Sequence, residues 1–161
     1  MRERMQFVRL LTEIGLFFRA QKIQMRFGEL SRSPLRMLRF ELRGETAECD
    51  WMARPGDHWD AHVPPRVAEL NVTNQALKDV IAVRELLFVA LPEVEAASLR
   101  VYRPSGSGEP DLIIIGRVTR EQGSMRHIAS LAMRAKLLGL HFWLQDGVLE
   151  SLQSEKCAIS F

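Results

Sequence analysis

The sequence predicts an α+β protein in which three helices pack on a five- to six-stranded mixed or antiparallel sheet, in the order αββαββαββ. Two patterns carry this prediction. Some stretches alternate apolar and polar residues, as strands with one buried face do, and between them apolar residues recur every three or four positions, as in amphipathic helices. The length of 161 residues and the apolar share of 47% fit a single domain, residues 1–161, with a sizeable core.

The first helix is predicted over about residues 3–22, within an N-terminal amphipathic unit that spans 1–27. Its apolar stripe has the spacing i, i+3, i+4 and i+7 and consists of Phe7, Leu10, Leu11, Ile14, Phe17 and Phe18. Basic residues surround this stripe. A helix of this kind can lie on a membrane surface, cover a sheet or pair with a second copy of the chain. We favour packing or dimerisation, because amphipathic stripes are usually buried in protein.

A hairpin is predicted over residues 36–52, turning at Gly44. The side chains expected to face the core alternate on both sides of this turn and are Leu38, Phe40, Leu42, Ala47, Cys49 and Trp51. The inward position of Cys49 makes it a small buried apolar residue and not a metal ligand. The two cysteines, Cys49 and Cys157, form no disulfide framework of the kind found in small secreted proteins.

A long connection over residues 53–70 and a second helix follow. Prolines at 55, 64 and 65 favour a loop, and loops of this length are often functional. The helix is expected to begin at Asn71 or Thr73 and to end at Pro92. Its inward positions are Leu77, Val80, Ile81, Leu87, Phe88 and Leu91.

The last third of the chain predicts two strands, a helix and a final hairpin. The strands cover 97–103 and 111–119, and the segment PSGSGEP between them is a turn and not a phosphate loop, because it leads into a strand. The third helix is expected to open at Gly123 and Ser124. Asp146-Gly147 predicts the hairpin turn. Residues 46–145 thus follow β-α-β-β-α-β, the split-βαβ order of ferredoxin-like folds. Inward positions of the third helix are Ile128, Leu131, Ala132, Ala135 and Leu138.

The segment DHWDAH, residues 57–62, suggests a metal site. His58 and His62 would share one face of a helix, and Asp50, Asp57 or Asp60 could add a carboxylate ligand. The segment lacks the glutamate of the H-E-x-x-H motif, and the flanking prolines oppose a regular helix. A solvated loop anchored by Trp59 is the alternative that we favour. A small-molecule site would add the outward rings of Tyr102, His141 and Trp143.

A weak nucleic-acid surface is the remaining candidate. It would consist of basic residues on and before the third helix, namely Arg117, Arg120, Arg126, Arg134 and Lys136. The sheet lacks the aromatic motif of RNA-binding domains with this strand order, and arginines on the wet face of a helix are usually just solvated. No serine lies in a G-x-S-x-G context that would predict nucleophilic catalysis.

Charge is distributed unevenly along the chain although the net charge is only +2. Residues 1–43 carry a net +6 and residues 44–115 a net −6, which indicates a polarised surface. No signal peptide is predicted, and the longest apolar run is interrupted by Arg84 and Glu85, so no membrane span is expected. These features predict a cytoplasmic, non-enzymatic interaction or assembly domain without a cofactor. Its partner, or a second copy, would bind the N-terminal helix and the 53–70 connection.

Overall fold

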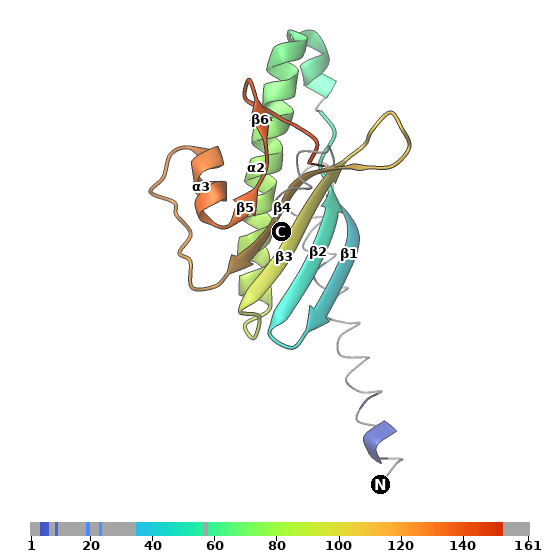
Figure 1. Cartoon of the computed structure of the whole chain (residues 1–161), viewed down its shortest axis with the longest axis vertical. Helices are drawn as coiled ribbons and strands as arrows, with labels where there is room; N and C mark the ends of the chain where they lie inside the picture. Colours follow the sequence, from blue (N-terminus) through green and yellow to red (C-terminus); the bar gives the residue numbers. More distant parts are fainter. Residues whose placement is uncertain are drawn as a thin grey trace.

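The protein is a five-stranded sheet with one long helix along one of its faces (Figure 1). The structure, a computed structural model, describes residues 4–6, 9, 19, 23, 35–56 and 58–152, with only the backbone of His58 and Trp59. Its elements in chain order are β1 (Arg36–Arg43), β2 (Thr46–Met52), the 3-10 helix η1 (His58–His62), α2 (Pro65–Ala90), β3 (Ala96–Arg103), β4 (Asp111–Thr119), α3 (Leu131–Leu137), β5 (Leu140–His141), β6 (Leu144–Gln145) and β7 (Val148–Leu149). The predicted α+β class is confirmed.

The strands lie side by side in the order β1-β2-β3-β4-β5, and β6 and β7 form a separate two-stranded sheet. Neighbouring strands are antiparallel except β2 and β3, which are parallel and are connected through α2. A split βαβ unit would hold a third strand between the two strands that its helix connects. Because β2 and β3 pair directly, the observed order differs from the ferredoxin-like pattern that we predicted for residues 46–145.

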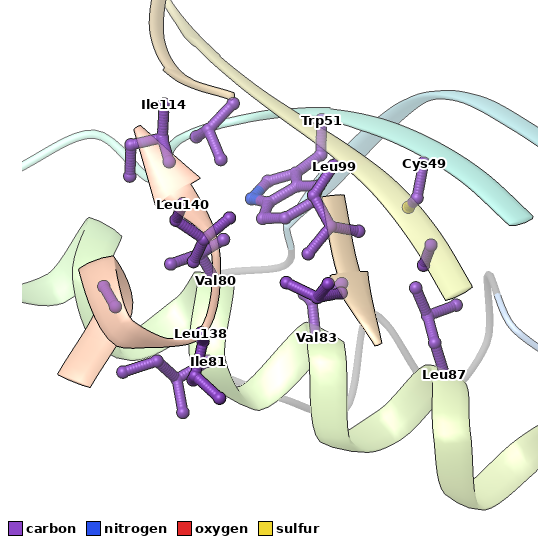
Figure 2. Packing of buried hydrophobic residues seen from close by; sticks show 14 of the residues in the cluster. Cys49, Trp51, Val80, Ile81, Val83, Leu87, Leu99, Ile114, Leu138 and Leu140 are labelled. Atoms are coloured by element: carbon purple, nitrogen blue, oxygen red, sulfur yellow. The ribbon is translucent and has the colours of Figure 1, made fainter. Parts of the chain in front are cut away.

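The core lies between the sheet and α2. Figure 2 shows Cys49, Trp51 and Leu99 pointing from the strands toward α2, and all three are fully buried. The facing residues of α2 include Val80, Val83 and Leu87, also fully buried. Each large apolar side chain buried in this way stabilises the fold by about 1.5–3 kcal/mol. Burial raises the pKa of the Cys49 thiol, which keeps it protonated, as expected for a core cysteine.

A β-bulge changes which residues of β1 face the core. The register shifts between Met37 and Arg39, so Met37 lies opposite Trp51 on the core side. Leu38, which we predicted to face the core, is 41% exposed. One extra residue in a strand reverses the alternation on one side of it, which single-strand periodicity does not reveal. The predicted inward positions Phe40 and Leu42, which follow the bulge, pack against the core.

Helix α2 begins earlier than predicted. Residues 65–70, expected to be loop, form its first turns, because Pro65 occupies the first helical position, where proline costs no hydrogen bond. Neither predicted cap is used. Asn71 instead donates its side-chain amide to Asp60 at 3.0 Å, and the Thr73 hydroxyl accepts the backbone N–H of Leu149 at 3.1 Å. All six predicted inward positions from Leu77 to Leu91 are buried, as expected.

Helix α3 is shorter than predicted. It begins after Ser130, whose hydroxyl accepts the Met133 N–H at 3.2 Å, and not at Gly123 or Ser124. Met125 adopts a left-handed φ of 53°, which a helix cannot contain. Ala135 and Leu138 are buried as expected, and the other three predicted inward residues are half-buried.

The final hairpin is confirmed. Asp146 and Gly147 both have positive φ, 51° and 82°, as a two-residue type I′ turn requires. The turn joins β6 to β7. Before it, Gly116 of β4 and Gly139 approach so closely that a Cβ on Gly116 would lie 2.3 Å from the Gly139 oxygen.

The residues of the predicted N-terminal apolar stripe lie outside the described residues. Of the described residues in this part of the chain, Ile23 is 1% exposed and belongs to the core, and Arg19 forms an ion pair with Glu93 just after α2. In the part of the chain that the structure describes, no helix is long and apolar enough to cross a membrane.

Candidate interaction surface

The predicted metal segment forms the 3-10 helix η1 beside the first half of α2. Asp60 is half-buried and holds the Asn71 side chain, whereas His62 is exposed. Asp57 and the side chain of His58 lie outside the described residues. Among the side chains that are described, no three His, Cys, Asp or Glu residues gather closely enough to hold a metal ion. The metal site predicted in residues 57–62 therefore stays a prediction.

A buried ion pair stands next to this segment. Arg54, directly after β2, donates Nε to Oδ2 of Asp79 on α2 at 2.8 Å and Nη2 to the other carboxylate oxygen. Gln75 donates to the same carboxylate at 2.9 Å. The Asp79 side chain is only 5% exposed and that of Arg54 15%. The pair ties the loop after β2 to the middle of α2. Sequence analysis missed it, because the two residues lie in different elements.

Two adjoining hollows lie at the carboxyl ends of β2 and β3, beside the first half of α2. One, of about 230 Å³, is polar and is lined by residues that include Arg54, Asp60 and Asn71. The other, of about 440 Å³, is mainly apolar and reaches Arg103 and Val148. Carboxyl ends of parallel strands commonly hold ligands. Here, however, the Arg54 charge is already balanced by Asp79, so the pair serves structure more directly than ligand binding.

The three predicted ligand-binding rings do not converge. Tyr102 and His141 lie on the sheet face opposite α2, Tyr102 next to Leu112 and His141 next to Ile115 in the strand register. Strand β4 separates them. Trp143 lies beyond the end of β5 and is 58% exposed.

The five predicted nucleic-acid residues are spread over different surfaces. Arg120 caps the end of α2, donating three N–H groups at 2.8–3.0 Å to the backbone oxygens of Phe88, Leu91 and Val94. Arg134 donates to the backbone oxygen of Ile128. Arg117 is exposed on the sheet face, Arg126 pairs with Glu85 at 3.4 Å, and the Lys136 amine lies 5.4 Å from the Phe142 ring centre.

Arg84 is a buried cation that sequence analysis did not single out. It is 5% exposed and donates to the backbone oxygens of Thr119, at 2.8 Å, and Gln122. Burial lowers its pKa. The guanidinium groups of Arg84 and Arg120 lie 5.1 and 5.0 Å from the centre of the Phe88 ring. The two arginines therefore join the end of β4 to the end of α2, in a structural role.

The sheet face opposite α2 carries an alternating row of charges. Asp50 lies between Arg39 on β1 and Arg100 on β3, and its carboxylate is 3.8 Å from the Arg100 guanidinium. Arg39 reaches Glu48 at 2.8 Å. Asp50 is 8% exposed although this face is open, and burial raises its pKa while the two arginines oppose that rise. The charges at the centre of this face thus satisfy one another.

Exposed apolar side chains gather in the C-terminal third. Four of the eight large exposed apolar residues among those described fall within residues 133–144, and we call them the C-terminal apolar residues: Met133, Leu137, Trp143 and Leu144, with exposed fractions of 53, 46, 58 and 38%. Leu144 also lines a hollow of about 460 Å³ between α2 and the start of α3. Exposed apolar residues scattered singly are ordinary, whereas a contiguous apolar patch marks an interaction site.

Comparison with known proteins adds no relative: no protein-family model, no curated protein and no solved structure matches this chain.

Proposed function

We propose that this chain is a non-enzymatic protein-interaction or assembly domain that contacts its partner through the C-terminal apolar residues. The observation that carries the proposal is the 58% exposure of Trp143 together with the three apolar neighbours in the chain. Tryptophan is enriched at the centres of protein interfaces, where one buried ring supplies much of the binding energy.

The arrangement of α3 supports this reading. Met133 and Leu137 are four residues apart on α3 and therefore project from the same side of the helix. Behind them Ala135 is fully buried, so α3 packs on the body of the protein with one face and presents apolar side chains on another. The hollow beside Leu144 adds a concave element lined by Leu70, Leu77 and Leu131, large enough to receive side chains of a partner.

This proposal moves the partner surface from where the sequence predicted it. The N-terminal helix lies mostly outside the described residues, and the connection after β2 is shortened by the early start of α2. Neither carries the proposal. A partner protein and a second copy of the chain are both compatible with an apolar contact, and the experiment below distinguishes them.

Site-specific photo-crosslinking in the producing cells tests the proposal. A benzophenone amino acid would replace Trp143 in one variant and Val89 in a control, because Val89 is 73% exposed near the end of α2. We expect a discrete crosslinked species at position 143 and none at 89. A band at twice the chain mass identifies a second copy, and any other single band a partner protein. Equal crosslinking at both positions, or none at 143, would refute the proposal.

A further inference from the structure

The two edges of the five-stranded sheet differ in what pairs with them. At the β4 edge, β5 pairs at Ile115 and Gly116, and the backbone N–H of Leu152 donates to the Leu112 oxygen at 2.8 Å. At the other edge, β1 pairs with β2 alone among the described residues. Figure 1 shows β1 at the margin of the sheet, with no labelled element beside it. The outer backbone groups of β1 can therefore accept another strand.

The side chains of β1 show which strand would fit. After the bulge, Arg39, Glu41 and Arg43 lie on the open face, and Phe40 and Leu42 on the core side. Arg39 contacts both Glu41, at 3.0 Å, and Glu48, at 2.8 Å, and Arg43 contacts Glu41 at 2.9 Å. The surplus positive charge of β1 therefore lies on Arg43 and on the exposed Arg36, which pairs with Met52 on the same open face. The Arg43 side chain is 69% exposed. Phe40 and Leu42 are only partly buried, which leaves an apolar flank toward the edge.

We propose that the β1 edge binds an extended acidic segment of a partner protein, which adds to the sheet as a sixth strand. Backbone hydrogen bonds to β1 supply affinity, and side chains at alternating positions supply specificity. Acidic side chains of the segment lie opposite the arginines, at about 4.5–5.5 Å between Cβ atoms. Apolar side chains on its other face extend the row of Phe40 and Leu42. The matching segment therefore alternates polar and apolar residues, with acidic side chains opposite Arg39 and Arg43 and an uncharged polar side chain opposite Glu41.

A second copy of β1 fits this edge poorly. Antiparallel pairing centred on Glu41 would set Glu41 against Glu41 and Arg39 against Arg43, and like charges opposite each other are destabilising. Pairing centred on Phe40 would match Arg39 with Glu41. This register fails at its ends, because it would place Arg43, on the open face, opposite Met37, which the bulge turns to the core side. Pairing centred on Leu42 would match Glu41 with Arg43, but β1 ends at Arg43, so only Glu41, Leu42 and Arg43 of each copy would pair. Charge, the bulge and the strand end therefore favour a different chain.

This surface is separate from the C-terminal apolar residues, so the two proposals fail independently. The probe, called the glutamate-valine peptide, is a capped, fluorescent seven-residue peptide, Val-Glu-Val-Thr-Val-Glu-Val, whose central threonine lies opposite Glu41. Its control, the lysine-valine peptide, has lysine in place of both glutamates. Two further versions of the probe carry N-methyl groups on the glutamates and threonine or on all valines. In a bound strand, the backbone N–H groups of successive residues point to opposite sides of the strand. Only one of the two N-methylated peptides would therefore lose N–H groups that bond to β1. Binding is followed by fluorescence anisotropy with the full chain.

We expect the glutamate-valine peptide to bind and the lysine-valine peptide not to bind. One N-methylated peptide should lose binding while the other keeps it within about threefold. The double variant Arg36→Glu, Arg43→Glu should weaken binding about tenfold, since it reverses both surplus positive charges of β1. The matched charge reversal Arg126→Glu, at a side chain that is 76% exposed in a loop away from β1, should leave binding unchanged.

The proposal would be overturned by no binding of the glutamate-valine peptide, by equal loss with both N-methylated peptides, or by equal weakening with Arg126→Glu. A dimer that dissociates when Arg43 is reversed would also overturn it, because the edge would then bind a second copy. Circular dichroism of each variant confirms that the exposed substitutions leave the fold intact. Trp143→Ser should not change peptide binding, which separates this surface from the C-terminal apolar residues.

Discussion

Replacing Arg54 with methionine would leave the buried carboxylate of Asp79 without its charged partner. In the folded protein, Arg54 donates two hydrogen bonds to this carboxylate, and the Asp79 side chain is 5% exposed. Methionine retains most of the apolar stem of the arginine and removes only the guanidinium. The variant therefore isolates the effect of the charge and its hydrogen bonds from the effect of packing.

Breaking a buried ion pair from one side typically costs 3–5 kcal/mol. We expect a value near the lower limit, about 3 kcal/mol, because Gln75 still donates to Asp79 and water reaches the 15% exposed Arg54 position. In a chain of this length 1 kcal/mol corresponds to roughly 2–4 °C in Tm, so Tm should fall by about 6–12 °C. Removing both partners, Arg54→Met with Asp79→Met, should restore stability to within about 1 kcal/mol of the original.

Urea denaturation of the wild type, both single variants and the double variant forms a double-mutant cycle that measures the coupling directly. The exposed Arg126→Met substitution, which breaks the surface pair with Glu85, serves as the control and should change the midpoint little. The reasoning is refuted if Arg54→Met costs less than about 1 kcal/mol, or if the double variant is no more stable than the single one.

Three further substitutions test other parts of the structure. Burial raises the pKa of Asp50, so the contribution of Asp50 to stability is lost as pH rises from the ordinary carboxyl pKa through the raised pKa. Asp50→Asn should remove this pH dependence, which urea denaturation midpoints measured over about pH 3–7 would show. Arg120→Met removes three bonds to the end of α2 and should cost about 2–4 kcal/mol in thermal unfolding, of which Arg120→Lys should recover only part. Gly116→Ala should destabilise the fold strongly, because the new Cβ would collide with the backbone oxygen of Gly139. Gly106→Ala serves as the control and should have little effect, because open space surrounds Gly106; chemical denaturation compares the two variants.

Much of the fold could be predicted because its elements follow local rules. The alternation around Gly44 and the Asp146-Gly147 turn identified two hairpins, and the spacing of apolar residues identified the buried side of α2. Boundaries were less predictable. Pro65 suggests loop when read as a helix breaker, yet it fits the first helical position without penalty. The bulge before Arg39 depends on pairing with β2, which a single strand does not encode.

The order of strands and the polar contacts could not be predicted, because they depend on residues far apart in the chain. Nothing in the local pattern shows that β2 pairs directly with β3. Arg54, Arg84 and Arg120 look like surface residues in the sequence, but each is held by partners on another element. The exposure of Trp143 was also anticipated only in part, as an outward ring and not as one member of an apolar group.

Within the five-stranded sheet, the longest loop that folding must close ends where β2 meets β3. The hairpins β1–β2 and β3–β4 pair residues that are close in sequence, whereas Thr46 meets Ala96 across the whole of η1 and α2. Closing such a loop costs chain entropy before any contact offsets it, and contacts between distant residues slow folding. Among the pairings of the sheet, we therefore expect the parallel one to form last, with α2 as the covalent link that keeps the two hairpins near each other.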